Sequence, residues 1–462
     1  VLDKTPGHTI LRLDLTGIDQ RSVQTPQGEA VVVSMPDGTP LLQAGAPDVP
    51  KFAASLLIPD AGAMTYSILQ SEYQDFPNVY VAPSKGDLKR KVDPASVPYS
   101  YGTAYEHNAF YPGQLADLQK PFVLRERRGQ GIWIYPVQYN PVTRVLRVYT
   151  SITLLASSTP ENGINENPGT AAHSASRTFR QLYQQTFANY DGADFTRSGE
   201  TPEKMLVIAK DEFVETLQPL VTWKRQMGIH TTVVSASEVG SSSTDIYNFV
   251  KNYYEEHAIT YLLLVGGADV LEPQMRQDGG DYSCDNCFGY LEGDDNAPEV
   301  FVGRFHADNI SQLEIMVHRN LDYEKTPLTD PAQNWCAQGM WSASNEGQGI
   351  GDDNQADYEQ GNAWKTEQLA DGYEKFWEFY DGNHGDISPT PGDETADQNG
   401  NPVNTQLVNI INNRGIGVYN YTGHGWEQGL VPIQDHFAGS AGEIDLAGLD
   451  AMAIDREAQV VL

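Results

Sequence analysis

A histidine between two glycines, near the end of the chain, is the residue whose setting best suits chemistry. An apolar, β-prone run at 416–419 leads into Gly423, His424 and Gly425. This pattern predicts a buried strand of a parallel sheet that ends in a tight loop, where α/β sheets bind their ligands. There His424 could act as a general base or acid, and the Gly425 N–H could stabilise an oxyanion. A hydrogen-bonded structural histidine is the alternative, and the glycines and the strand end favour the functional role.

Three carboxylates follow a second apolar stretch, around Trp341. Glu346, Asp352 and Asp357 lie in a Gly-rich segment at a predicted strand end. One of them could orient the imidazole, as the third member of a catalytic triad does. Another could line a pocket for a cationic side chain.

A further acidic segment at 291–299 precedes a predicted strand. It contains Asp294, Asp295 and Glu299, and Asp269, Asp281 and Asp285 lie upstream. Such oxygen ligands suit Ca²⁺, although the spacing is not that of an EF-hand. A solvated acidic surface is an equally good interpretation of the composition.

The cysteines indicate no disulfide-rich scaffold and no zinc ribbon. Only Cys284, Cys287 and Cys336 occur, and the first two form a single CxxC where a zinc ribbon needs two. A local disulfide or two free thiols is therefore favoured over a metal site.

Composition restricts the partners. The 462 residues allow two to four domains, and 62 acidic against 30 basic side chains give a net charge of -32. This charge disfavours nucleic acid and anionic membranes as partners. No run of eighteen apolar residues predicts a membrane span, and no signal peptide is recognisable in this sequence.

The chain is expected to hold two domains of different class. Residues 1 to about 157 show short apolar runs between turn residues, which predict an all-β sandwich or barrel. A polar stretch at about 157–197 predicts a linker that exposes Arg177, Arg180 and Arg197 to proteolysis. From Lys204, strands and helices alternate, with a helix expected over 211–227, which predicts a parallel sheet with helices on both faces.

Several motifs, in order along the chain, resemble the gingipain family of secreted cysteine peptidases (family C25), most nearly its Arg-specific members. Those in the first domain are GAPDVPKFAASLLIPD (45–60), APSKGDLKRKVDP (82–94), VPYSYGTAYEHNAFYPG (97–113) and YNPVTRVLRVYT (139–150). Those in the second are TYLLLVGG, GDDNAPEVFVGRF, LDYEK and NYTGHG. The resemblance implies a β-rich propeptide at 1–197 and a caspase-like α/β catalytic domain at 198–462.

The resemblance also assigns roles to residues. It implies His424 and Gly425 as the catalytic histidine and the oxyanion-hole residue, with Glu346 or Asp352 supporting the imidazole. It implies Asp357 at the base of the S1 pocket, which would pair with a basic P1 side chain, Arg favoured over Lys. Structural calcium is implied at Asp295 and Glu299, with Asp285 as a further candidate, and no organic cofactor is expected.

The nucleophilic cysteine of the family follows the next strand, and residues 458–462 resemble the start of that strand. The nucleophile is therefore expected beyond Leu462, and the chain as given is expected to be inactive. A peptidase with a different P1 preference, or a calcium-stabilised binding or adhesion protein with the same fold, is the alternative.

The first domain is then expected to keep the enzyme latent through an intramolecular complex. Arg125, Arg127 and Arg128 are candidates to enter S1 as a pseudo-substrate, and Arg197 is the favoured activation site. The substrates would be proteins or peptides, and the location secreted or at the cell surface.

Overall fold

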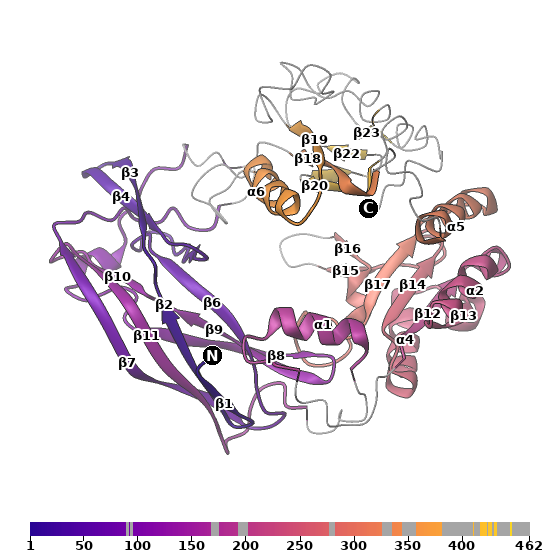
Figure 1. The fold of residues 1–462 in the computed structure, drawn as a ribbon, viewed down its shortest axis with the longest axis horizontal. Coiled ribbons are helices and arrows are strands. Elements are labelled where there is room, and N and C mark those ends of the chain that lie inside the picture. The colour runs from indigo at the N-terminus through magenta and orange to yellow at the C-terminus, as the bar shows by residue number, and fades with distance from the viewer. Residues whose placement is uncertain are drawn as a thin grey trace.

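The computed structural model shows two regions, one rich in β-strands and one of alternating strands and helices (Figure 1). The structure describes residues 1–88, 92, 96–167, 175–192, 202–276, 282–325, 335–343, 357–380, 410, 416–422, 424–426, 429–431 and 444–445. No helix among these residues is long and apolar enough to cross a membrane.

The N-terminal region is built from short strands and two long ones. Its strands are β1 (Asp3–Thr5), β2 (His8–Asp14), β3 (Asp19–Thr25), β4 (Gly28–Ser34), β5 (Thr39–Pro40), β6 (Pro50–Leu57), β7 (Ala63–Pro77), β8 (Ala116–Leu124), β9 (Arg127–Ile134), β10 (Val137–Asn140) and β11 (Val145–Thr159). A short 3-10 helix, η2 (Thr103–Glu106), interrupts them.

These strands form two larger sheets that pack face to face. One has the order β1–β2–β11–β10, with β7 also paired to β11, and the other has the order β5–β6–β9–β8. Alternate residues of β11, including Ile152 and Leu154, are buried, as expected for a strand with one face in a core. Leu154 belongs to the same core cluster as Leu56 of β6 and Ile132 of β9. This is the packing of a β-sandwich.

The C-terminal region begins with a parallel sheet of order β13–β12–β14–β17. Its strands are β12 (Lys204–Ala209), β13 (His230–Ser235), β14 (Tyr261–Val265) and β17 (Phe301–Phe305), and its helices are α2 (Gln218–Gln226), α3 (Ala236–Val239), α4 (Ser243–His257) and α5 (Ile310–Lys325). Leu206 and Ile208 pack with α4, whereas Val207 and Ala209 pack with α2 and α5. Helices therefore cover both faces of this sheet, as the sequence predicts.

The helix expected over 211–227 is shorter than predicted. A 3-10 turn, η3 (Asp211–Phe213), comes first, and α2 begins only at Gln218. Pro219 lies in the first turn of α2, where a proline costs no hydrogen bond, and Gly228 follows the helix with a φ of 89°. The predicted end is therefore right, and the predicted start is wrong.

The stretch predicted to be a linker contains a helix, α1 (Arg177–Thr186), which lies between the two regions in Figure 1. Its N-cap is Ser176, whose side chain accepts a hydrogen bond from the Phe179 N–H. Phe179 and Tyr183 are buried in one cluster, against which Phe301 of β17 packs. The linker prediction is wrong here. Phe179 and Tyr183 are one helical turn apart and form an apolar face, whose burial stabilises a helix in spite of the polar composition of the stretch.

A second parallel sheet, of order β19–β18–β20, follows. Its elements are η5 (Trp335–Ala337), β18 (Gln338–Ala343), α6 (Asp357–Ala370), β19 (Lys375–Tyr380) and β20 (Val418–Thr422). The predicted strand before His424 is thus present, and it is parallel to β18. After it come antiparallel strands: β21 (His424–Trp426), β22 (Gly429–Val431) and β23 (Ile444–Asp445). His424 therefore begins a strand, whereas the sequence predicts a tight loop.

Candidate active site

The candidate site is defined by the carboxyl ends of β18 and β20. The two strands are adjacent and parallel, and Ala343 is in register with Thr422 at their last residues. Glu346 follows β18 by three residues, and His424 follows β20 by two. Each residue is therefore within about 10 Å of chain from its strand end, since an extended residue spans about 3.3 Å. Glu346 and Asp352 themselves lie outside the described residues, and of His424 and Gly425 the structure describes the backbone.

Helix α6 begins at the same edge of this sheet. It connects β18 to β19, which run parallel, so the helix starts near the carboxyl ends of the strands. Asp357 is its first residue. Tyr358, the next residue, packs against Trp341 and Phe376 of the sheet, which fixes this end of the helix. The carboxyl ends of β18 and β20 and the start of α6 thus lie at one edge of the sheet.

A buried hydroxyl pair lies beneath this edge and escaped the sequence analysis. The Tyr419 Oη donates to Ser342 Oγ over 3.0 Å, and both residues are buried. Burial raises the pKa of Tyr419 far above that of a free tyrosine, so its hydroxyl stays protonated. The bond joins β18 to β20 one to three residues before the strands end. The signal available in the sequence was a hydroxyl-bearing residue, Ser342 or Tyr419, within each of the two apolar strands.

All three cysteines of the chain lie among the described residues. Cys284 and Cys287 form a disulfide, which confirms one of the two favoured states of the CxxC. Cys336 is exposed and lies in η5, at the amino end of β18. It is therefore at the opposite end of that strand from the segment that carries Glu346.

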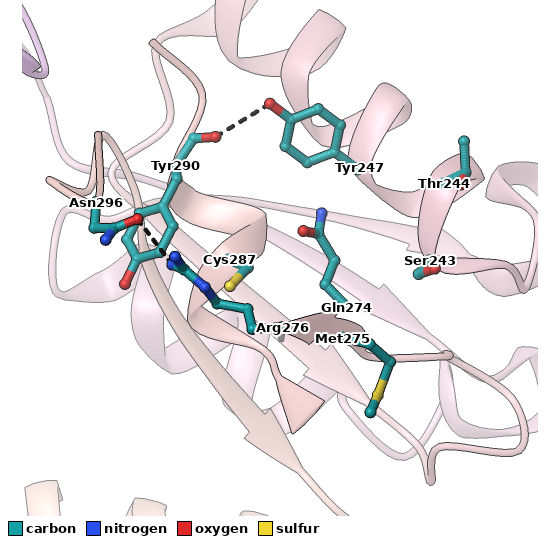
Figure 2. Close-up of a pocket in the computed structure, with 9 residues that line it drawn as sticks. All are labelled: Ser243, Thr244, Tyr247, Gln274, Met275, Arg276, Cys287, Tyr290 and Asn296. Carbon is teal, nitrogen blue, oxygen red and sulfur yellow. Dashed lines mark hydrogen bonds between the residues drawn. The ribbon is translucent and has the colours of Figure 1, made fainter. Parts of the chain in front are cut away.

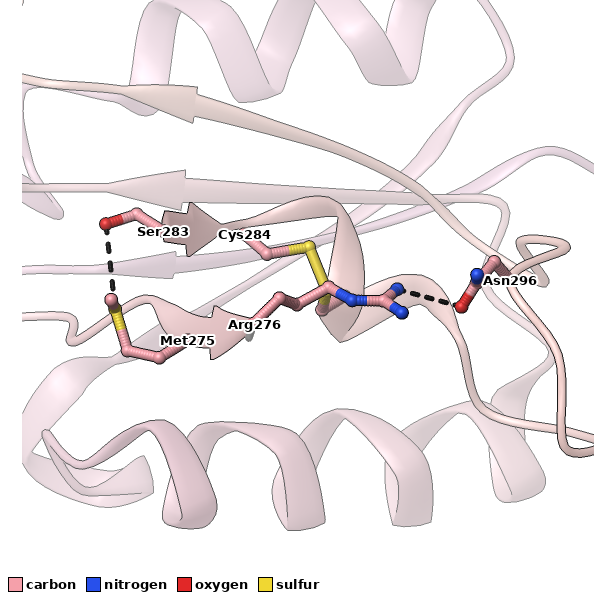
Figure 3. Close-up of a disulfide and its surroundings, with 6 residues drawn as sticks. Met275, Arg276, Ser283, Cys284 and Asn296 are labelled. Carbon is pink, nitrogen blue, oxygen red and sulfur yellow. Dashed lines mark hydrogen bonds between the residues drawn. A yellow bond between two sulfur atoms is a disulfide. The ribbon is translucent and has the colours of Figure 1, made fainter. Parts of the chain in front are cut away.

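Figure 3 shows how the disulfide closes a small hairpin of β15 (Gln274–Arg276) and β16 (Tyr282–Cys284) onto the 3-10 helix η4 (Asn286–Gly289). The Arg276 Nη1 donates to Asn296 Oδ1 over 2.8 Å beside it. The hairpin borders an open pocket of about 560 Å³, whose lining residues are drawn in Figure 2. Tyr247 and Tyr290 meet across this pocket, where Tyr247 Oη donates to the Tyr290 carbonyl over 3.1 Å. None of the predicted site residues lines it.

The three carboxylates predicted to bind calcium accept hydrogen bonds from nitrogen donors. The Asp285 carboxylate accepts hydrogen bonds from Nε and Nη2 of Arg304, at 2.7 and 2.6 Å. Asp295 Oδ2 accepts from the Val123 N–H at 2.9 Å and from Asn165 Nδ2 at 3.0 Å. Its Oδ1 accepts from the Ala297 N–H.

Glu299 is buried, and both of its carboxyl oxygens also accept hydrogen bonds from nitrogen donors. Its Oε2 accepts from the N–H groups of Leu291 and Glu292 at 2.7 and 3.0 Å, and its Oε1 accepts from the Arg125 N–H at 3.2 Å. Within the described part of the chain, no three His, Cys, Asp or Glu side chains gather as a metal ion would require. In this arrangement Asp285, Asp295 and Glu299 therefore do not fit a calcium ion.

The arginines predicted to act as a pseudo-substrate make different contacts. The guanidinium of Arg128 donates within the N-terminal region, to the carbonyls of Pro59, Gly62 and Ile164. That of Arg125 donates to carbonyls next to β14 and β17, in a different sheet from the one that His424 follows. Neither of these two guanidinium groups is free to enter the S1 pocket, so Arg125 and Arg128 do not meet the pseudo-substrate prediction. For Arg127 it stays a prediction.

Comparison with known proteins assigns the chain to a class. A model of the C25 propeptide matches residues 8–196, and a model described as peptidase family C25 matches residues 198–449. The organisation is that of a cysteine peptidase preceded by its propeptide. The chain belongs to peptidase family C25.

Named relatives agree with this family. Gingipain R1 of Porphyromonas gingivalis is 34% identical over 414 residues, which is 88% of this chain and 39% of that protein. Gingipain R2 of the same species, strain W83, is 33% identical over 412 residues, 88% of this chain and 52% of that protein. The chain thus spans about half or less of these relatives. A solved complex of the pro- and mature domains of RgpB from P. gingivalis is 34% identical, covering 41% of this chain and 96% of that one, with a TM-score of 0.38.

Proposed function

We propose that the chain belongs to the zymogen of a secreted cysteine endopeptidase that cleaves after basic residues, with arginine favoured. The boundary between propeptide and catalytic domain would lie at Arg197, whose cleavage would activate the enzyme. Membership of family C25 and the two abutting family matches support this proposal.

The observation that carries the proposal is the register of β18 with β20. Since Ala343 is in register with Thr422, the strands that precede Glu346 and His424 end at adjacent positions of the sheet. A general base and the carboxylate that orients it need this proximity. The start of α6 adds Asp357 at the same edge.

The proposed reaction uses a cysteine thiolate as nucleophile. The thiolate attacks the carbonyl carbon after P1, while the Gly425 N–H stabilises the oxyanion. His424 takes the thiol proton and returns it to the leaving amine as the C–N bond breaks. Glu346 or Asp352 holds the imidazole in orientation. Water then releases the acyl group, with His424 again as the base.

Selectivity is assigned to Asp357. A carboxylate at the base of S1 forms two parallel hydrogen bonds with a guanidinium, whereas the ammonium of lysine makes a single point contact. This is the physical reason to favour Arg over Lys at P1.

Latency is assigned to the propeptide, because its hairpin β8–β9 is bound to the C-terminal region. Calcium remains a proposal for the form that has lost the propeptide. In that form Asp295 would lose the donors from Val123 and Asn165, and Glu299 the donor from Arg125.

The test is an assay of the full-length gene product, after propeptide removal, on matched peptides with Arg or Lys at P1. We expect thiol-dependent cleavage after Arg that His424→Ala reduces by at least about 1000-fold. Asp357→Asn should lower kcat/KM on the Arg peptide by about 100-fold, and Asp371→Asn, an exposed change just after α6, should not. Cleavage after neither residue would leave the family assignment and remove the specificity.

A binding protein with this fold is the second candidate. The acidic chain, with a net charge of -32, would suit a basic or cationic partner. A full-length product with no cysteine able to reach His424 would favour this function.

A further inference from the structure

The turn of hairpin β8–β9 contains a residue that violates a local preference. Arg125 and Glu126 form the two-residue turn between Leu124 and Arg127, which pair across the hairpin. Arg125 has a φ of 57°, a left-handed conformation that favours glycine at such a turn position. An arginine here needs a compensating interaction.

That interaction is with the C-terminal region. The Nη1 of Arg125 donates to the carbonyls of Ile259 and Glu299 at 2.7 and 2.8 Å, and its Nη2 donates to the carbonyl of Ala258 at 2.9 Å. These carbonyls lie just before β14 and just before β17, two adjacent parallel strands. They form an arginine socket at the amino-terminal edge of this sheet.

Aromatic rings close the socket. The Arg125 guanidinium carbon is 5.5 Å from the ring centre of Tyr254 on α4 and 4.6 Å from that of Phe179 on α1. Arg125 is fully buried, with an exposed fraction of 0%. The Glu126 carboxylate lies 3.6 Å from its Nε, so the buried charge has a partner from its own turn.

The backbone of the turn is held at the same place. The Arg125 N–H donates to Glu299 Oε1, and nearby Lys120 of β8 pairs with Asp294 over 2.7 Å. The backbone of the turn and Lys120 therefore bind the segment 294–299, and the Arg125 side chain binds that segment and the carbonyls at 258 and 259.

We propose that this arginine socket is a propeptide-binding site apart from the candidate active site, and that Arg125 is the residue through which it holds the propeptide. Its ligand is an arginine presented at the tip of a β-hairpin. Three carbonyls arranged around a planar group suit the fork of a guanidinium, whereas an ammonium would reach fewer of them. This inference depends on the proposed function in one respect: it takes the residues before Arg197 to be the propeptide.

The test uses the full chain, with a recognition sequence for a site-specific protease inserted between Gly192 and Pro202 and cut after folding. Dilution followed by size-exclusion chromatography then gives the dissociation constant of the two pieces. Arg125→Gly relaxes the turn backbone and removes the guanidinium, so we expect an affinity at least about 100-fold weaker. Arg125→Lys should lie between this variant and the wild type.

Arg144→Gly is the matched control. Arg144 also has a positive φ, 56°, and lies before β11 in the N-terminal region, but it is exposed and its neighbour is Tyr80. We expect its replacement to leave the affinity unchanged. An Arg125→Gly complex as tight as the wild type would overturn the proposal.

A second measurement needs no variant, which keeps the proposal testable if Arg125→Gly does not fold. Phenylglyoxal modifies accessible guanidinium groups, and peptide mass spectrometry reports each site. In the uncut wild-type chain we expect Arg125 to be protected and Arg144 to react, with Arg125 becoming reactive after the pieces separate. Equal reactivity of the two in the uncut chain would reject the socket.

The outcome is separable from the fate of the proposed function, because neither measurement uses peptidase activity. Dissociation of the Arg125→Gly pieces in a protein without activity would support the socket and count against the peptidase. An active peptidase whose propeptide binds as tightly with Arg125→Gly as with Arg125 would support the proposed function and reject the socket.

Discussion

Glu299 shows at the scale of a single residue how burial and hydrogen bonding oppose each other. Burial raises the pKa of this carboxyl from 4.5 to about 8, although three backbone N–H groups work in the opposite direction. A folded-state pKa above the unfolded one means that the folded chain holds its proton more tightly. The contribution of Glu299 to stability is therefore fully present below pH 4.5 and is lost as the pH rises toward 8.

We expect the stability of the uncut chain to fall over this pH range by up to about 1.4 kcal/mol per unit through this one group. Glu299→Gln, which does not titrate, should flatten the profile, and the exposed Glu374→Gln should leave it as it is. Thermal unfolding midpoints at pH 5, 6.5 and 8 measure the effect. Parallel profiles for wild type and Glu299→Gln would contradict it.

Residue types were easier to predict than residue partners. The family resemblance, together with the carboxylate side chains of Asp295 and Glu299, made calcium the ligand to expect. Their donors at Arg125, Val123 and Asn165 lie more than 120 positions away in sequence. Such long-range partners leave no periodicity in the sequence.

At the scale of elements, α1 is the helix that joins the two regions. Phe179 contacts the Arg125 guanidinium, and its ring centre lies 4.9 Å from that of Phe301. Removal of a fully buried phenylalanine typically costs 3–5 kcal/mol. We therefore expect Phe179→Ala to lower the unfolding midpoint by several degrees.

The control is Gln184→Ala, an exposed change on the same helix that should shift the midpoint by less than about 1 °C. Differential scanning calorimetry of the uncut chain compares the two. Similar small shifts for both variants would mean that α1 contributes no more than the linker predicted for this stretch.

The strands and the helices around the first parallel sheet could be predicted because their apolar periodicity is strong. The alternation of strands and helices was expected to begin at Lys204, and β12 begins at that residue. The start of α2 was misplaced because acidic residues at 211 and 212 resemble a helix start, whereas here they begin a 3-10 turn. Helix α1 was missed because its polar flanks dominated the composition, although Phe179, Tyr183 and Phe187 recur at intervals of four.

At the scale of the whole molecule, the acidic segment 294–299 forms part of the contact between the two regions. The carboxylates proposed to bind calcium are already engaged with nitrogen donors in the uncut chain. We therefore expect a calcium chelator to shift the unfolding midpoint of the uncut chain by less than about 1 °C. The control is the same chelator saturated with calcium beforehand, and a calcium-dependent loss of several degrees would show that the uncut chain already holds the ion.

The order of the two regions was predictable from motifs, and the contact between them was not. Motifs report local patterns, but the hairpin turn at 125–126 docks through backbone carbonyls that any sequence at 258, 259 and 299 would supply. Only the three-dimensional arrangement reveals that contact.

This main-chain character of the socket has an evolutionary consequence. Substitution at Ala258 or Ile259 changes a side chain and leaves the accepting carbonyl in place, whereas most substitutions at Arg125 remove the donor. Selection would then act on one side of the contact only. Among homologues, Arg125 should persist without co-varying with positions 258 and 259, so methods that infer contacts from correlated substitutions should overlook these hydrogen bonds.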